Sequence, residues 1–275
     1  MILVRTTPEA LASASSLGDR LAAASGLAVA MLIDERRAPA GECRHAKIGL
    51  TRAGYADLGL HMPPDVGWRC GDYGLYAARH RYPQIEHFWL FEDDVRVTGD
   101  AERLFRISAD LPELDLMVAR LAPARADWWW WPHLSSSDAP PWRCFFPVMR
   151  ISARALDTLH AIRRKHSGQL SRKALWPNDE AFVATTVVHQ GFARADLNDV
   201  CPALYDDATF SYDNLLRADV DDRGTDGPPR LLHPVLGGEA YARKAGRKAA
   251  SHRPPSLAYL ARRTIARRVN SLRRW

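Results

Sequence analysis

The stretch that decides the fold is His87-Phe88-Trp89-Leu90-Phe91-Glu92-Asp93-Asp94-Val95. Its first five residues form an apolar run of the length and composition of a strand buried on both faces, and three acids follow at once. In an open α/β sheet, ligands bind beyond the carboxyl ends of the strands. The sequence therefore predicts an α/β sheet with an acidic site where this strand ends.

Further strands and helices alternate on both sides of this stretch. Short apolar runs predict strands at residues 2–4, 28–33, 116–119 and 145–151. Capping residues followed by helical patterns predict helices that start after Thr7, at Asp72, and after Asp100, Ser152 and Asn178. This alternation predicts an α/β fold, with a mixed, mostly parallel sheet and helices on both faces. Glycines and Pro63-Pro64 interrupt residues 36–68, where no long element is expected.

The composition is that of a globular protein with a sizeable core. The chain has 275 residues, of which 47% are hydrophobic and 25% charged. The longest uncharged apolar run, residues 21–33, is shorter than the roughly 20 residues needed to cross a bilayer, and the chain begins without a basic leader. Four cysteines lie far apart, without a CxxC pair, and are expected as reduced core residues. We expect a cytoplasmic protein.

Positive charge is concentrated at the C-terminal end. Residues 241–275 contain 11 Lys and Arg and no acid, whereas residues 1–240 contain 27 basic and 32 acidic residues. We therefore expect a catalytic domain over 1–240 and a basic tail over 241–275. Residues 256–272 predict an amphipathic helix whose arginines suit an anionic membrane at its inner face, or else a helix packed on the body or a solvated arm. No nucleic-acid partner is expected, because a dedicated nucleic-acid domain would carry its basic groups across the body.

The three acids after the central strand favour a metal site. Adjacent carboxylates repel one another, and a divalent cation offsets that repulsion. Oxygen ligands of this kind favour Mg²⁺ or Mn²⁺. The alternative is an acidic loop that caps the next helix or pairs with arginines such as Arg96.

The segment Glu92-Asp93-Asp94 resembles the metal-binding DXD-type motif of glycosyltransferases with the GT-A fold, in its EDD form. The wider stretch from Trp68-Arg69-Cys70-Gly71-Asp72-Tyr73 to Thr98-Gly99 is similar to a group of glycosyltransferase-like proteins. The likeness is specific over about residues 68–100 and only topological elsewhere. It implies a GT-A-like, Rossmann-like domain that moves a sugar from a nucleotide-diphosphate sugar to a saccharide or lipid-linked acceptor, in bacterial surface polysaccharide assembly.

The resemblance also implies roles for individual residues around the donor. Asp94 matches the acid that coordinates the metal bridging the two phosphates, and Glu92 and Asp93 match positions that face the ribose and the sugar. Arg5 and Thr6, which follow the first strand, match the place where these enzymes hold the nucleotide base.

Three other residues have alternative interpretations. Asp34 and Asp72 are candidates for contact with the base or ribose, although Asp34 also suits a turn or cap. His233, at the end of an apolar run, matches the second protein ligand of the metal, since a neutral imidazole binds Mn²⁺ beside carboxylates. A histidine before proline is also commonly structural.

The acceptor side is expected near Trp176-Pro177-Asn178-Asp179-Glu180. Inverting transfer needs a carboxylate that takes the proton of the acceptor hydroxyl, and Asp179 or Glu180 is the candidate base. The alternative is that both acids only complement the dipole of the helix that they begin. The four tryptophans at 128–131 are a candidate acceptor wall or, alternatively, a hydrophobic plug.

Two other functions compete with glycosyl transfer. A metal-dependent phosphoester hydrolase also uses clustered Asp and His, but it usually includes Asp-His or His-x-His pairs, which the body lacks. A non-catalytic protein that binds membrane or nucleic acid on a transferase-like scaffold would work through its tail. Mn²⁺-dependent nucleotide binding by the body separates these functions.

Overall fold

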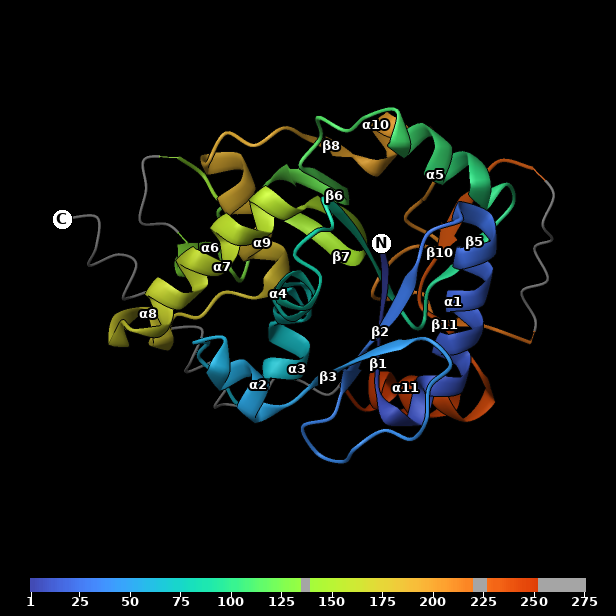
Figure 1. Ribbon diagram of the computed structural model, residues 1–275, viewed down its shortest axis with the longest axis horizontal. Coiled ribbons are helices and arrows are strands. Elements are labelled where there is room, and N and C mark those ends of the chain that lie inside the picture. The colour runs from blue at the N-terminus through green and yellow to red at the C-terminus, as the bar shows by residue number, and fades with distance from the viewer. Residues whose placement is uncertain (135–138, 220–226, 252–275) are drawn as a thin grey trace.

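The computed structural model describes residues 1–134, 139–219 and 227–251, and within them a seven-stranded sheet forms the centre (Figure 1). Its order is β3-β2-β1-β4-β7-β6-β8. The strands are β1 (Ile2–Thr6), β2 (Val29–Asp34), β3 (Ala46–Leu50), β4 (His87–Glu92), β6 (Leu116–Pro123), β7 (Trp142–Ser152) and β8 (Arg194–Asp196). Only β7 runs antiparallel to its neighbours, so the predicted mixed, mostly parallel sheet is confirmed.

Helices cover both faces of the sheet, as predicted (Figure 1). One face packs against α1 (Leu11–Ser25) and α5 (Ala101–Ala109). The other packs against α4 (Asp72–Arg81), α7 (Ala153–Ser167) and α9 (Asp179–His189). Several further helices are short: η1 (Pro8–Ala10), α2 (Arg52–Asp57), α3 (Val66–Arg69), α6 (Trp131–Leu134), α8 (Leu170–Ala174) and α10 (Leu197–Val200).

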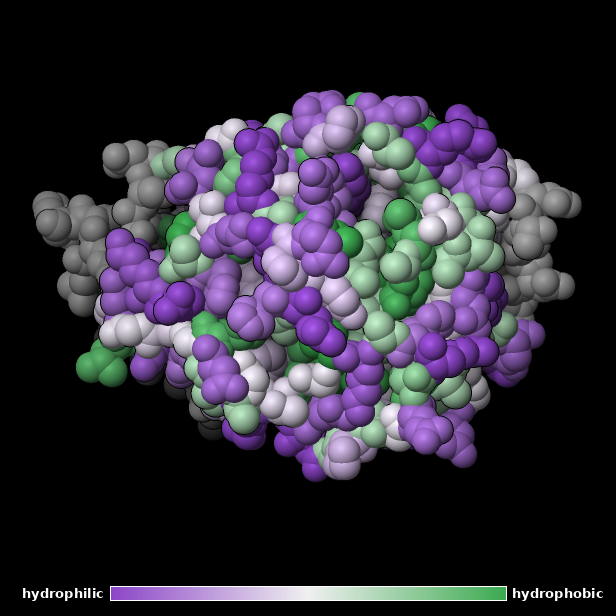
Figure 2. Space-filling view, in the orientation of Figure 1, coloured by the Kyte–Doolittle hydropathy of each residue, from purple (hydrophilic) through white to green (hydrophobic). Residues whose placement is uncertain are grey.

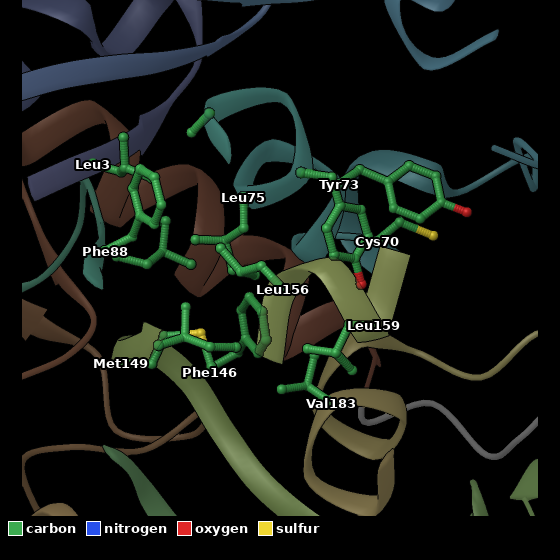
Figure 3. Close-up of a cluster of buried hydrophobic side chains, with 14 of the residues drawn as sticks. Leu3, Cys70, Tyr73, Leu75, Phe88, Phe146, Met149, Leu156, Leu159 and Val183 are labelled. Carbon is green, nitrogen blue, oxygen red and sulfur yellow. The ribbon is translucent and has the colours of Figure 1, made fainter. Parts of the chain in front are cut away.

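Strand β4 contributes to both halves of the core because successive side chains of a strand point to opposite faces. Phe88 and Leu90 pack with the α4 and α7 side, part of which Figure 3 shows, whereas Trp89 and Phe91 pack with the α1 and α5 side. All four side chains are buried. The apolar run of the sequence is thus a strand buried on both faces, and the acids emerge at its carboxyl end.

Three of the predicted helix caps are confirmed. The side chains of Asp100, Ser152 and Asn178 each accept a hydrogen bond from the backbone N–H three residues later. Thr7 makes no such bond, and the chain first forms the 3₁₀ turn Pro8–Ala10 before α1 begins.

The sequence missed two strands at the margins of the sheet. Strand β3 buries only two of its five residues, and β8 has three residues, so neither has a strong apolar pattern. The expectation that all four cysteines are core residues was wrong for Cys43, which is half-buried; the other three are buried, and all four are free thiols.

The C-terminal part of the described chain is a helix, α11 (Gly238–Ser251). The expected domain boundary after residue 240 falls inside this helix, and the guanidinium of Arg217 lies 5.8 Å from the ring centre of Tyr241. The amphipathic helix expected over 256–272 lies outside the described residues. Among the helices that are described, none has the length and apolarity to span a membrane.

Candidate functional site

Two adjoining pockets open beyond the carboxyl ends of β1 and β4. The strand-end pocket, of about 160 Å³, includes Thr6, Asp34, Tyr55 and Asp93 in its lining. The α9 pocket, of about 240 Å³, is lined by a different set that includes Trp68, Phe146, Asp179, Glu180, Tyr212, His233 and Lys244. Arg5, Glu92 and Asp94 line both pockets. This is the edge of the sheet at which the sequence predicted a site.

Glu92, Asp94 and His233 converge where the two pockets meet. One potential ligand atom from each lies within 4.8 Å of the others. His233 Nε2 lies 3.2 Å from Asp94 Oδ1 and 3.8 Å from Glu92 Oε2. Strand pairing explains the approach, because β10 (Arg230–Leu232), directly before His233, pairs with β5 (Arg96–Thr98), directly after the acids.

The chemistry of this cluster suits a divalent cation. Asp94 Oδ1 is buried, and its near polar neighbour among the described residues is His233 Nε2 at 3.2 Å, without the geometry of a hydrogen bond, which leaves a lone pair for a cation. Burial disfavours charge on both acids, but Arg5 and His233 lower the pKa of Glu92, and His233 and Lys244 lower that of Asp94. Two ionised carboxylates and an imidazole form a donor set that suits Mn²⁺ or Mg²⁺.

His233 is held in place for this contact. It is only 4% exposed, its Nδ1 lies 3.2 Å from the Ser211 carbonyl oxygen, and the Val235 N–H donates to the Asp94 carbonyl oxygen at 2.7 Å. Burial opposes protonation, yet Asp94 and Glu92 raise the pKa of His233 to about 9. To act as a metal ligand, His233 would therefore have to lose its Nε2 proton.

The middle acid of the triplet points elsewhere. Thr6 Oγ1 donates to Asp93 Oδ2 at 2.6 Å, and burial together with Asp94 raises the pKa of Asp93 to about 7. Strand β4 ends at Glu92, and in the turn that follows, the Asp93 side chain lies beside Thr6, apart from the cluster of Glu92, Asp94 and His233. Glu92, which the resemblance matched to a donor-facing position, lies with Asp94 and His233 and also lines the strand-end pocket.

Arg5 connects the two pockets. Its Nη2 lies 2.7 Å from Glu92 Oε1, its Nη1 lies 3.8 Å from Asp179 Oδ2, and Nη1 has no hydrogen-bond partner among the described residues. Gly71 makes this arrangement possible, because a Cβ at that position would overlap both Arg5 and Asp179. The guanidinium thus lies between the acidic cluster and the start of α9.

Asp179 is occupied by backbone contacts. Its Oδ2 accepts from the Gly71 N–H and its Oδ1 from the Glu180 N–H, both at 2.8 Å. The side chain is buried, and burial and the neighbouring Glu180 raise its pKa well above the usual range. These hydrogen bonds connect the start of α9 to the start of α4, so the Asp179 side chain stabilises the packing of the two helices.

Glu180 has the properties of a proton acceptor. Burial raises its pKa to about 7, although hydrogen bonds from Tyr212, the Phe146 N–H and Asn178 favour the ionised form. A carboxyl group that titrates near neutrality in a pocket is suited to general base catalysis. The structure therefore separates two acids that the sequence left equivalent.

Asp34 lines the strand-end pocket but already has a partner. Arg36 Nε donates to its Oδ1 at 2.7 Å, and Arg36 Nη2 donates to its Oδ2 at 2.5 Å. Asp34 is the last residue of β2, as expected. Its carboxylate bonds to Arg36 in the turn that follows and also lines the strand-end pocket.

Asp72 does not reach either pocket, so its assignment to the base or ribose is corrected. Its side chain is fully buried and accepts hydrogen bonds from Arg163 Nε and Tyr76 Oη, both at 2.8 Å. Arg163 Nη1 also donates to the Pro177 carbonyl oxygen at 3.2 Å, just before α9. The ion pair between Asp72 and Arg163 thus holds α4 and the segment before α9 together behind the pockets. The sequence did not indicate this pair, because the two residues are 91 positions apart.

Breaking this pair should destabilise the fold. Arg163→Met leaves the Asp72 carboxylate buried without its cation, which we expect to lower the free energy of unfolding by about 3–5 kcal/mol. Urea denaturation measures the change. Arg164→Met, which removes an exposed arginine from the next position, is the control. A loss below about 1 kcal/mol for Arg163→Met would contradict the structural role.

Three residues of the α9 pocket were missed by the sequence analysis. Tyr212 lies in an irregular segment, Lys244 lies in the basic tail with its Nζ 3.4 Å from Asp94 Oδ2, and Trp68 is 61% exposed. Tyr212 and Lys244 stand in no motif. Trp68 begins the stretch that resembles glycosyltransferase-like proteins but was given no role there, so only the pocket identifies all three as site residues.

Of the four consecutive tryptophans only Trp130 is buried, and its ring centre lies 6.1 Å from that of Trp68.

Comparison with solved structures gives likenesses at low sequence identity. The sequence matches no protein-family model and no curated protein. A glycosyltransferase involved in the glycosylation of the major capsid of PBCV-1 is 11% identical over 90% of this chain and 97% of the other, with a TM-score of 0.42. The galactosyltransferase LgtC, in complex with donor and acceptor sugar analogues, is 12% identical over 95% and 99%, with a TM-score of 0.47. Mouse xyloside xylosyltransferase 1 is 15% identical over 84% and 96%, with a TM-score of 0.41. These TM-scores lie below 0.5, so the likenesses alone assign neither a fold family nor an activity.

Proposed function

We propose that this chain is a metal-dependent glycosyltransferase that moves a sugar from a nucleotide-diphosphate sugar to a saccharide or lipid-linked acceptor. The observation that carries the proposal is the convergence of Glu92, Asp94 and His233 between two pockets, one of which holds a buried acid with a pKa near 7. A cation site flanked by two pockets fits a reaction between two substrates whose leaving group is a diphosphate. The EDD resemblance points in the same direction.

Glu92, Asp94 and His233 are the residues that would hold Mn²⁺ or Mg²⁺. When bound, such an ion would offset the negative charge of the departing diphosphate. In this proposal the nucleoside occupies the strand-end pocket, where Thr6, Asp34 and the buried Tyr55 form part of the wall. Arg5 supplies a fixed positive charge between the nucleoside and the α9 pocket.

The acceptor occupies the α9 pocket in this proposal. Glu180 takes the proton from the acceptor hydroxyl as its oxygen bonds to the anomeric carbon, and the bond from that carbon to the diphosphate breaks. This is inverting transfer with Glu180 as the general base. The exposed ring of Trp68 offers a flat apolar face for a sugar. The polysaccharide pathway and the membrane contact of the tail rest on the sequence alone.

A thermal-shift screen of nucleotide sugars, with and without Mn²⁺, tests the proposal directly. At a ligand concentration about 100 times Kd, binding stabilises the native state by roughly 2.7 kcal/mol. We expect this shift for at least one UDP-, GDP-, CDP- or TDP-sugar and only with the metal. No Mn²⁺-dependent shift with any donor would contradict transfer. Release of phosphate from phosphoesters at a higher rate than any sugar transfer would favour the hydrolase instead.

The rate of transfer should depend on the ionisation of Glu180. A general base works only when deprotonated, so kcat should fall as the pH drops below about 7. Tyr212→Phe removes a hydrogen bond that favours the carboxylate, which should raise the pKa of Glu180 and move the acid limb to higher pH. A pH–rate profile of both proteins measures the shift, and identical acid limbs would contradict this coupling.

A further inference from the structure

A third cavity, which we call the rear cavity, lies at the opposite end of the sheet from the candidate active site. It encloses about 650 Å³ between α1, α5 and the starting ends of β1 and β4. His87, at the start of β4, lines it, and Glu92, at the other end, lies about 16 Å further along the strand at 3.3 Å per residue. The rear cavity is therefore separate from the two pockets already described.

The wall of the rear cavity is largely apolar. Leu27, Ile85, Trp89 and Phe105 contribute to it, and Leu27 remains 37% exposed. The face in Figure 2 carries hydrophobic surface, drawn in green, beside the place where Figure 1 marks the N-terminus. A volume of this size lies within the range of about 300–1,000 Å³ that is usual for small-molecule sites.

The rear cavity also contains a buried cation without a counter-ion. Arg150 is 6% exposed, and its Nη1 donates to the Leu111 carbonyl oxygen at 3.0 Å and to Met117 Sδ at 3.5 Å. Its Nε and Nη2 donate to none of the residues that the structure describes, and no described carboxylate lies within 4.0 Å of the guanidinium. Burial consequently lowers the pKa of Arg150, against a weaker opposite effect of Glu113. A buried charge of this kind is costly unless an anion compensates it.

The other charged side chains in the wall are placed differently. Glu86, Glu102 and Arg106 are all exposed to solvent, where water screens their charge. Arg106 lies 3.7 Å from Asp100, outside the cavity lining. The buried and half-buried charges that face the cavity are thus positive: Arg150 and the N-terminal ammonium of Met1, whose pKa is lowered by burial and by Arg150.

We propose that the rear cavity is a binding site for a small amphiphilic anion, whose acidic group pairs with Arg150 and whose apolar part packs against Trp89, Phe105 and Ile85. Guanidinium groups bind carboxylate, sulfonate and phosphate oxygens through paired N–H donors, and two of the donors of Arg150 are unused. The proposal is independent of glycosyl transfer, because it involves none of the residues of the candidate active site.

The dye 8-anilinonaphthalene-1-sulfonate has this chemistry and is a direct probe. We expect the full chain to bind one dye molecule with enhanced fluorescence, and UDP with Mn²⁺ to leave that fluorescence unchanged. Dodecanoate should displace the dye and dodecanol should not, because only dodecanoate carries the charge. Displacement by UDP with Mn²⁺, or equal displacement by the two lipids, would overturn the proposal.

Variants connect the binding to Arg150. Arg150→Met should weaken dye binding by about 10- to 100-fold, as expected when a hydrogen-bonded charge partner is lost. Leu27→Glu adds a negative charge at an exposed position of the wall and should also weaken dye binding. If circular dichroism shows that Arg150→Met does not fold, the affinity of Leu27→Glu for the dye tests the proposal. Arg103→Met removes an exposed arginine from α5 outside the cavity and should have no effect. Unchanged affinity in Leu27→Glu and in folded Arg150→Met would refute the site.

Discussion

Replacing Asp94 with alanine should lower the Mn²⁺-dependent affinity for a nucleotide-sugar donor by at least about 100-fold, since even residues behind metal ligands contribute about 10–100-fold. Asp94 has the buried oxygen without a hydrogen-bond partner and lies nearest to His233. Isothermal titration with Mn²⁺ alone, and then with donor in the presence of Mn²⁺, measures both steps. The variant should keep its fold, because the backbone bond from Val235 to position 94 is retained.

The neighbouring Asp93→Asn is the matched control for this experiment. Asp93 bonds to Thr6 and is not part of the cluster formed by Glu92, Asp94 and His233, so its replacement should leave the affinity for Mn²⁺ within a few-fold of the original, a difference of less than about 1 kcal/mol. If Asp94→Ala binds Mn²⁺ and donor as the unaltered protein does, the metal site is wrongly assigned. A loss of Mn²⁺ binding only in Asp93→Asn would move the site to the other side of the strand.

Replacing Glu180 with glutamine should lower kcat by about 10²–10⁴-fold and leave the affinity for donor and Mn²⁺ unchanged. The amide has nearly the same shape but cannot take the proton of the acceptor, and the loss appears only as the transition state forms. Steady-state kinetics with a transferable donor, together with donor titration, separate the two quantities. Near-normal turnover would exclude Glu180 as the base.

Asp179→Asn distinguishes the two acids at the start of α9. Its carboxylate accepts from the Gly71 and Glu180 N–H groups, so the substitution should weaken the packing of α9 and lower the thermal midpoint. At temperatures where the variant is folded, kcat should fall much less than in Glu180→Gln. A larger loss of kcat in Asp179→Asn, with an unchanged thermal midpoint, would assign the base to Asp179.

The basic segment near the C-terminus matters for the design of a shortened chain. Lys244 lies in the α9 pocket, with its Nζ 3.4 Å from Asp94 Oδ2. Truncation after residue 240 therefore removes a group from the candidate site as well as the tail. A test of membrane contact should instead end the chain after Ser251, so that α11 is retained.

The sequence by itself determined the alternation of strands and helices, the place of the acidic triplet and three of the helix caps. These features are local: apolar runs follow the period of each element, and a cap bonds to the backbone three residues later. For that reason the bounds of β4 and the first residues of α4 and α9 were predicted close to those observed, whereas the weakly patterned edge strand β3 was not predicted.

Only the tertiary structure decided what each acid does. Asp72, Asp93, Asp94, Asp179 and Glu180 are all acids near strand or helix ends. The sequence left Asp179 and Glu180 equivalent, and the resemblance alone distinguished the roles of the other three. Packing gives each a different partner: a buried arginine 91 positions away for Asp72, a threonine of β1 for Asp93, a histidine for Asp94, backbone N–H groups for Asp179 and a tyrosine for Glu180. The charge and pKa of a carboxyl group depend on its burial and on the charges within a few ångströms, and those neighbours come from distant parts of the chain.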